Sequence, residues 1–304
     1  MSGCACHARA PRYPSDLSDA EWELLRPEAQ AVMAQLRRSP AGRPMEHDLR
    51  AVLDGVRYVS RYGIEWRALP VDFPPWEAVY AFFERWNARG LPQALVDRLR
   101  GRLRVALGRA ELPTAGSIDS QSVKAADTVG AASRDFDGGK KINGRKRHVV
   151  VDSLGLVLAV LVTAASVQDR DGAYRLLALL RERFSTITLI WADGGYAGRL
   201  VSWARTVLAL TLTIVKRSDN TSGFVVLPRR WVVERTFGWL MRYRRLVRDY
   251  ERRPEHHEAM VLWATVAIMT RQLTRTKSHA PPHPRWGQPR TLAPAPQQQD
   301  QQAA

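Results

Sequence analysis

The sequence is poor in cysteine. Its only two cysteines, Cys4 and Cys6, lie at the N-terminus and cannot form the disulfide framework of a small secreted protein. With His7 they still lack a fourth ligand at zinc-like spacing. No apolar run approaches the roughly 18 residues of a membrane-spanning helix, and no apolar signal-peptide segment opens the chain. We therefore expect a protein of the reducing cytoplasm with no membrane partner.

Acidic residues are also few in comparison with basic ones. The chain has 46 Lys and Arg against 30 Asp and Glu, a formal net charge of +16 at pH 7. Such a surplus creates an attractive field for a polyanion, which makes nucleic acid the leading partner. The alternative is a generally basic composition without a partner, since only clustered cations form a nucleic-acid footprint.

The 304 residues suffice for two ordinary domains. The pattern predicts a flexible N-terminus over residues 1–14 and a helical, DNA-binding domain over 15–112. A catalytic domain of strands and helices follows over 113–277. The last segment, 278–304, is rich in Pro and Gln, a composition that cannot build a core, and we expect it to be disordered.

The helical region opens with a capping box, in which Ser18 caps a helix and Glu21 completes the motif. A later stretch, Leu95 to Leu107, is apolar on one face and carries four arginines on the rest, at positions 98, 100, 102 and 104. This pattern is typical of a basic helix that enters a DNA groove, and equally of a helical bundle with a solvated basic face. The sequence leaves both open.

Beyond Thr114 the texture changes to short strands separated by turns. Strands are predicted over 117–123, 148–151, 156–163, 186–192 and 211–215, and helices over 171–184 and 231–243. Residues 148–163 form a hairpin around the turn at Asp152–Gly155. A hairpin followed by strand and helix alternation favours an α/β fold of the ribonuclease-H kind, with a mixed sheet flanked by helices. The small all-α domain precedes it.

Two aspartates occupy unusual places. Asp193 ends a nearly continuous apolar strand and is followed by two glycines, and ligands in α/β folds gather at the carboxyl ends of strands. Asp119 lies inside a predicted strand, where a carboxylate is costly unless it is paired or bound to metal. The alternative for Asp193 is a simple cap of the next turn.

A third acid, Glu234, lies on a predicted helix, where an exposed glutamate is common and by itself uninformative. Cations and apolar residues surround it in the segment from Arg229 to Trp239. Carboxylates from a strand, a strand end and a helix can converge on a pair of Mg²⁺ ions, because hard Mg²⁺ prefers oxygen ligands. The three acids are therefore candidate metal ligands for phosphoryl transfer.

Six motifs in order resemble the insertion-sequence transposases of the DDE class, in the family numbered five. The resemblance extends from Leu17 to about Tyr250. The matching stretches are Leu17–Leu25, Asp72–Trp76, Ile118–Lys124, Gly144–Asp152, Ala192–Tyr196 and Trp231–Phe237.

This resemblance implies that Asp119, Asp193 and Glu234 bind divalent metal on a ribonuclease-H-like core. It implies two Mg²⁺ ions, for which Mn²⁺ can substitute. The chain departs from a Tyr, Arg, Glu, Lys signature that related families carry around the last acid. Arg230 fits that signature, but Leu227 and Met241 replace the Tyr and the Lys, and Arg242 is the nearest cation to the missing Lys.

Basic residues near these motifs are predicted to contact DNA. A Gly-rich stretch before a predicted strand favours a phosphate-binding loop, with a solvated hairpin rim as the alternative. The candidates are Lys124, Lys140, Lys141, Arg145, Lys146, Arg147, His148, Arg230, Arg235 and Arg242. Trp239, Tyr243 and Tyr250 fit core packing better than stacking on unpaired bases.

The resulting hypothesis is a transposase that cleaves the inverted ends of its element and transfers the strands to target DNA. Its partner is double-stranded DNA in the bacterial nucleoid, and joining two ends requires a homodimer or larger assembly on DNA. One alternative is a catalytically silent or domesticated DNA-binding regulator derived from a transposase. Another is a general structure-specific nuclease, which shares the chemistry but cuts branched DNA irrespective of element ends.

Overall fold

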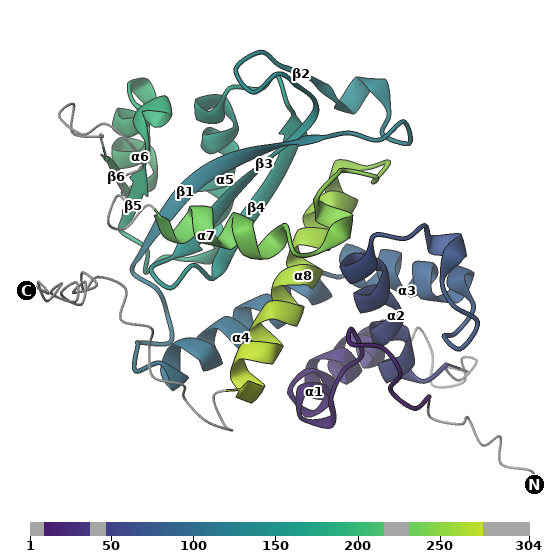
Figure 1. The fold of residues 1–304 in the computed structure, drawn as a ribbon. Helices are drawn as coiled ribbons and strands as arrows, with labels where there is room; N and C mark the ends of the chain where they lie inside the picture. Colours follow the sequence, from purple (N-terminus) through teal and green to yellow (C-terminus); the bar gives the residue numbers. More distant parts are fainter. Residues whose placement is uncertain (1–8, 37–46, 216–230, 276–304) are drawn as a thin grey trace, which may run out of the picture.

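A computed structural model describes residues 9–36, 47–215 and 231–275 (Figure 1). Arg230, Leu227 and the tail from residue 278 lie outside these ranges, as do residues 1–8 of the predicted flexible N-terminus. Residues 9–14 are described and pack on the helical region: the Arg9 guanidinium lies 3.8 Å from the centre of the Phe73 ring, on which the Tyr13 ring also stacks.

A mixed six-stranded sheet forms the centre of the α/β part. The strand order is β2-β3-β1-β5-β6, and β4 also pairs with β3. The pairs that involve β3 are antiparallel, whereas β1, β5 and β6 run parallel. The predicted α/β fold with a mixed sheet is confirmed. The strands are β1 (Ala115–Lys124), β2 (Asp135–Asp137), β3 (Ile142–Asp152), β4 (Val157–Ala164), β5 (Leu189–Ala192) and β6 (Thr211–Ile214).

The hairpin of β3 and β4 turns where the sequence predicts. Gly155 has φ 79°, a left-handed conformation that favours glycine, and the buried Asp152 carboxylate accepts the N–H groups of Leu154 and Leu156 at 2.9 Å. Strand β3 begins earlier than predicted, because Gly144 lets it approach β1 closely. A Cβ at Gly144 would lie 2.0 Å from the carbonyl oxygen of Val123.

Helices cover both faces of the sheet (Figure 1). Helices α5 and α6 bury Ile118 and Ile190 on one face, and α7 and α8 bury Val149 and Val151 on the other. The four helices are α5 (Asp169–Arg183), α6 (Arg199–Leu208), α7 (Trp231–Leu240) and α8 (Pro254–Arg275). Short 3-10 helices are η1 (Trp66–Ala68), η2 (Ala131–Ser133), η3 (Gly194–Tyr196) and η4 (Arg244–Leu246).

The N-terminal region is helical, as predicted. Its helices are α1 (Asp19–Leu36), α2 (Leu49–Tyr62), α3 (Trp76–Ala88) and α4 (Leu91–Ala106). The capping box is confirmed: the Glu21 N–H donates to the Ser18 hydroxyl at 3.2 Å, and the Ser18 N–H donates to the Glu21 carboxylate at 3.0 Å.

The last described helix joins this helical region to the sheet. Helix α8 packs against α1, α2 and α4 and also against β4, and one continuous apolar core runs from Phe83 through Trp263 to Val149. The predicted domain boundary falls between residues 112 and 113. The C-terminal helix α8 packs with the N-terminal helices, so the two predicted domains share one apolar core.

Helix α4 does not present a fully solvated basic face. Arg100 and Arg104 are buried: Arg100 donates to the carbonyl oxygen of Val157 at 3.0 Å, and Arg104 pairs with Asp152. These two arginines hold the helix against the β3–β4 hairpin. Because their side chains are used inside the protein, they cannot contact a DNA groove.

Within the described ranges, no helix combines the length and the apolar character that crossing a bilayer requires.

Glu258 on α8 makes stability depend on pH. Burial raises its pKa to about 7, although its carboxylate accepts the Val162 N–H at 2.8 Å. The folded protein thus binds more protons than the unfolded chain between its ordinary pKa of 4.5 and about 7, so stability falls as pH rises through this window. We expect Glu258→Gln to stabilise the protein at pH 8 by roughly 2–3 kcal/mol and to change little at pH 5.

Urea unfolding at both pH values measures this difference. Glu182→Gln, at an exposed position on α5, is the matched control and should leave the pH dependence unchanged. An equal effect of Glu258→Gln at pH 5 and pH 8 would exclude titration of this carboxyl as the cause.

Candidate functional site

Asp119 and Asp193 lie side by side at one edge of the sheet. Parallel strands β1 and β5 pair Ser117 with Trp191; Asp119 lies two residues further along β1, and Asp193 lies two residues after Trp191, just beyond the end of β5 in extended backbone. Side chains two residues apart point to the same face of a strand. Asp119 is paired with Val149, which packs beneath α7 and α8, so both carboxylates belong to the face that these helices cover.

Asp193 also caps the short helix η3. Its backbone is extended, at φ −86° and ψ −177°, and its Oδ1 accepts the Gly195 N–H at 2.8 Å. A Cβ at Gly195 would lie 3.0 Å from that same oxygen, so the glycine leaves room for the carboxylate. The structure thus shows both local features that the sequence offers for Asp193. Its side chain caps the following turn, and the residue stands directly after a strand.

A buried tyrosine lies within the electrostatic reach of both acids. Tyr196 is fully buried, and burial raises its pKa well above the ordinary value of 10.0. The negative charges of Asp119, Asp169 and Asp193 raise it further. Burial and the three carboxylates all disfavour the phenolate form, so Tyr196 stays protonated at physiological pH.

Asp169, the third of these acids, forms an ion pair with a lysine. The Lys146 ammonium lies 2.9 Å from the Asp169 carboxylate and 3.6 Å from that of Asp137. The Ser120 hydroxyl donates to Asp169 at 2.7 Å. Sequence reasoning did not single out Tyr196, although Tyr196 directly follows the two glycines after Asp193.

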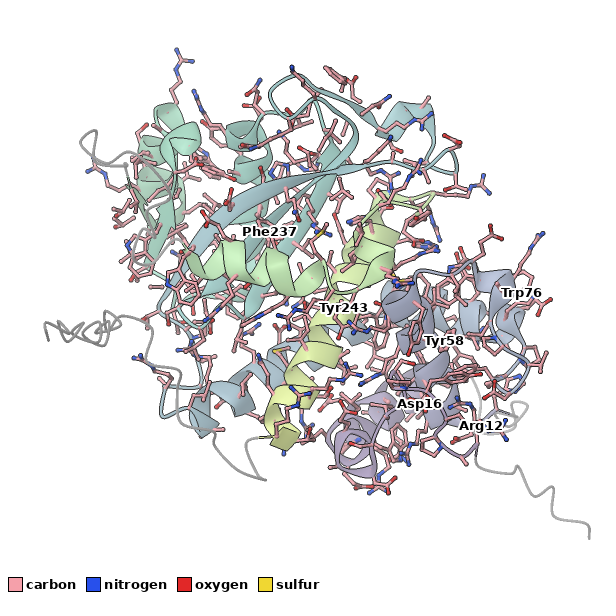
Figure 2. All side chains as sticks on the ribbon, viewed as in Figure 1. Arg12, Asp16, Tyr58, Trp76, Phe237 and Tyr243 are labelled. Carbon is pink, nitrogen blue, oxygen red and sulfur yellow. The ribbon has the colours of Figure 1, made fainter. Side chains whose placement is uncertain are left out.

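Glu234 lies on a different element, helix α7. Helix α7 packs on β1 and β3 and is fixed to the β3–β4 turn, where Thr236 donates to the Gly155 carbonyl and Arg235 to the Leu154 carbonyl, both at 2.7 Å. Phe237 of this helix, labelled in Figure 2, is buried in the same apolar cluster as Val149 of β3. Glu234 itself is exposed. The structure thus aligns the two aspartates and places the glutamate on the helix that crosses their sheet.

The donor chemistry of these three carboxylates fits a hard divalent cation, since Mg²⁺ is bound through oxygen. In the described ranges, however, no three His, Cys, Asp or Glu side chains are grouped so that they could hold a metal ion. Like charges repel at short distance, and a bound cation or a shared proton relieves that repulsion. The structure thus places the two aspartates on neighbouring parallel strands without grouping all three carboxylates.

Four of the residues predicted to contact DNA are buried instead. They are Arg145, Lys146, Arg147 and His148, with exposed fractions of 1%, 7%, 1% and 0%. Arg147 donates to the Gln121 side chain and to the Leu246 carbonyl, each at 3.0 Å. The prediction of a phosphate-binding loop does not fit these four residues, because the segment is an inner strand whose side chains bond to the protein itself.

His148 is not a cation at neutral pH. Burial lowers its pKa to about 4, and its Nε2 lies 3.0 Å from the Thr163 hydroxyl. Helix α5 closes over the ring at Gly172, where a Cβ would lie 2.4 Å from it. The predicted DNA contact therefore does not fit His148, whose buried ring packs beneath α5.

The remaining predicted DNA contacts are accessible, apart from Arg230 outside the described ranges. Lys124, Lys140, Lys141 and Arg242 are exposed. The turn that carries Lys140 is built on Asp137, whose Oδ1 accepts the N–H groups of Gly139 and Lys140 at 3.0 Å. Half-buried Arg235 lies between two indole rings, 4.3 Å from Trp231 and 4.6 Å from Trp239.

Comparison with known proteins gives matches over most of this chain. The family described as "Transposase DDE domain" matches residues 111–269, and the family described as "Putative transposase of IS4/5 family" matches residues 17–96. A curated relative from Burkholderia cepacia, "Putative transposase for insertion sequence element IS402", is 31% identical over 140 residues. That match covers 43% of this chain and 65% of the relative's length.

Proposed function

We propose that this chain, which belongs to the DDE-domain transposase family, cleaves DNA at the inverted ends of an insertion sequence and transfers the strands to target DNA. The observation that carries the proposal is that Asp119 lies on β1 and Asp193 directly follows β5, the strand that runs parallel to β1. Carboxylates brought to one region of a sheet in this way are suited to hold the divalent ions of phosphoryl transfer.

In the proposed site Asp119, Asp193 and Glu234 would hold two divalent ions, Mg²⁺ or Mn²⁺, and such ions would supply activation of the attacking oxygen and charge stabilisation at the departing one. The protein residues set the geometry. Strands β1 and β5 fix the two aspartates on rigid elements, and the fastening of α7 to the β3–β4 turn holds Glu234 on its helix. Lys146 neutralises Asp169, which keeps an additional negative charge away from the scissile phosphate.

Double-stranded DNA is the proposed substrate. The exposed cations Lys124, Lys140, Lys141 and Arg242 would contact phosphates, and such contacts position DNA without reading its sequence. Arg235 is a less direct candidate, because it already donates to Leu154. Because transposition joins two ends, the working complex contains at least two protomers.

A cleavage assay tests the proposal with DNA that carries the inverted ends flanking the gene. We expect strand nicking at the ends in Mg²⁺ or Mn²⁺, none in EDTA, and recovery when the metal is restored in excess. A DNA-binding regulator would shift the same DNA in a gel and never cut it. A general structure-specific nuclease would cut branched DNA equally well with or without the ends, and either result would overturn the proposed reaction.

A further inference from the structure

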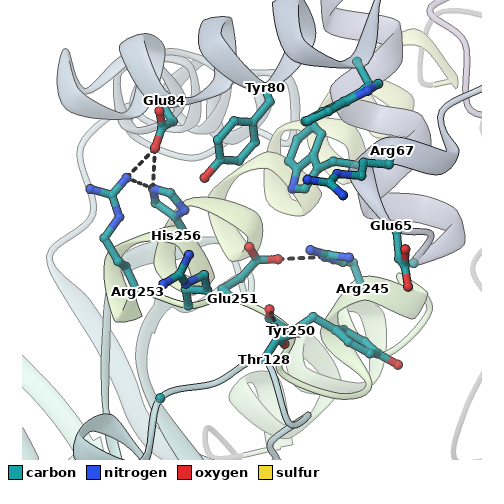
Figure 3. Close-up of a pocket in the computed structure, with 15 residues that line it drawn as sticks. Glu65, Arg67, Tyr80, Glu84, Thr128, Arg245, Tyr250, Glu251, Arg253 and His256 are labelled. Atoms are coloured by element: carbon teal, nitrogen blue, oxygen red, sulfur yellow. Dashed lines mark hydrogen bonds and ion pairs between the residues drawn. The ribbon is translucent and has the colours of Figure 1, made fainter.

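A cavity of about 1060 Å³ opens beside the helical region, apart from the aspartates (Figure 3). Helical residues from Gly63 to Glu84 form one wall, and the segments Thr128–Gly130 and Arg245–His256 form the other. The second wall is continuous with the end of β1, because Ala125 pairs with Asp249 and the Thr128 hydroxyl donates to the Tyr250 carbonyl at 2.9 Å. Its volume is at the upper end of the range for small-molecule sites, about 300–1,000 Å³.

Tryptophan and tyrosine rings contribute to both walls of the cavity. Trp66, Trp76 and Tyr80 come from the helical wall and Tyr250 from the opposite one. The Trp66 ring is held by edge contacts with the core, 5.0 Å from Phe83 and 5.2 Å from Tyr80 between ring centres. In Figure 3 the rings of Tyr80 and Tyr250 lie on opposite sides of the opening. Such an arrangement suits a flat, unsaturated ligand that stacks on aromatic side chains.

The charges at the cavity favour an anionic group on that ligand. Two of its acids are already paired within the protein, Glu84 with Arg253 at 2.6 Å and Glu251 with Arg245 at 2.7 Å (Figure 3). Arg67 and Arg252 are exposed at the cavity, against the exposed Glu65. Arginine presents a planar fork of donors that matches phosphate oxygens.

One buried donor also lacks an acceptor. The Trp66 Nε1–H is buried and has no hydrogen-bond partner among the described residues. An indole N–H can only donate, and a buried donor without an acceptor is costly. The carbonyl oxygens and ring nitrogens of a nucleobase are acceptors of the kind it requires.

We infer that this cavity binds an unpaired nucleotide of DNA, with its base stacked on Trp76 or Tyr250 and its phosphate held by Arg67 and Arg252. A paired base cannot occupy the site, because its faces are covered by its neighbours in the duplex. The inference rests on the proposed function for its ligand, DNA, and adds a second binding site to it. The site holds a single strand and does not require cleavage.

Binding of labelled oligonucleotides to the full chain, followed by fluorescence anisotropy in EDTA, tests the inference. The probes are an unstructured single strand of mixed sequence and the same strand annealed to its complement. We expect Trp76→Ala and Tyr250→Ala each to weaken single-strand binding about tenfold, as one lost base-stacking contact predicts, and duplex binding by less than about twofold.

Conservative variants separate stacking from damage to the fold. Trp76→Phe and Tyr250→Phe keep an aromatic face and should retain most of the single-strand affinity. Arg252→Ala, at an exposed position, should weaken single-strand binding several-fold without altering thermal unfolding. Trp203→Ala is the matched aromatic control, because Trp203 packs on Tyr174 at a distance of 4.7 Å between ring centres and does not line the cavity.

A photocrosslink locates the base directly. A single strand carrying 5-iodouracil should crosslink to peptides that contain Trp76 or Tyr250. Crosslinks found only elsewhere, unchanged affinity of both alanine variants, or equal loss for single strand and duplex would each overturn the inference. Unchanged affinity is also the result expected if a peptide segment occupies the cavity.

Failure of the inference can be told apart from failure of the proposed function. The binding assay contains no metal and therefore does not depend on cleavage. If the chain binds single strands through Trp76 and Tyr250 but never cleaves DNA, the inferred binding site stands and the proposed reaction is wrong. If the chain cleaves element ends but both alanine variants bind single strands normally, the proposed reaction stands and the inferred binding site is wrong.

Discussion

Asp119→Asn or Asp193→Asn is expected to reduce cleavage of element ends by roughly 10³-fold or more, because either change removes a negatively charged metal ligand. DNA binding should stay within about twofold of the parent chain, since the exposed cations that contact phosphate are unchanged. The measurements are a cleavage time course in Mg²⁺ and a gel shift with the same DNA.

Asparagine is the informative substitution because it preserves the local fold. Asp193 uses Oδ1 to accept the Gly195 N–H, and Asp119 uses Oδ1 to accept the Ser120 N–H at 2.7 Å. The amide oxygen of asparagine can accept both bonds. A loss of cleavage then reports the missing charge, and unchanged thermal unfolding checks that the strand end is intact.

Asp171→Asn is the matched control, since Asp171 is an exposed aspartate in the first turn of α5. It should cleave at the parental rate. Cleavage at that rate by Asp193→Asn would end the assignment of the acid. Rescue of a Glu234→Cys variant by Mn²⁺ in place of Mg²⁺ would favour Glu234 as the third ligand, because a thiolate binds the softer ion better.

The sequence could predict the aspartates because their signal is local. An apolar run that ends in Asp193 and two glycines predicts a strand end, and strand ends in α/β folds meet at one edge of the sheet. Glu234 has no such signal, because a glutamate on a helix is ordinary wherever the helix packs. Its position depends on how α7 is fastened to the β3–β4 turn, which is a tertiary property.

The buried basic strand could not be predicted from the same kind of pattern. Arginine and lysine are almost never fully buried unless they are paired, so a run of cations in a sequence predicts a surface loop. Their partners, Asp249 and Asp169, are remote in sequence, and the pairing appears only when the chain is folded. Tyr250 was also expected to be core, whereas it is half-exposed and lines the cavity, while Tyr243 is buried beside α7 (Figure 2).

Arg145 binds two distant segments together. Its guanidinium pairs with Asp249 at 3.0 Å and donates to the backbone carbonyls of Ser133, Glu251 and Arg252. Burial alone would raise the pKa of Asp249, but the neighbouring His257 and Arg145 hold it below its ordinary value, so the pair is ionised. Removing Arg145 takes away one of the two side-chain partners of this buried carboxylate and leaves His257, at 3.0 Å, as the other.

Arg145→Met is therefore expected to lower the free energy of unfolding by about 3–5 kcal/mol, the effect of breaking a buried ion pair from one side. Urea unfolding measures the loss, and Lys141→Met, which replaces an exposed cation, should stay within about 0.5 kcal/mol of the parent. The double variant Arg145→Met with Asp249→Asn should recover part of the loss, because it also removes the unpaired charge. If Arg145 contacted phosphate instead, Arg145→Met would weaken DNA binding and leave stability unchanged, and the buried network would not have the role assigned to it.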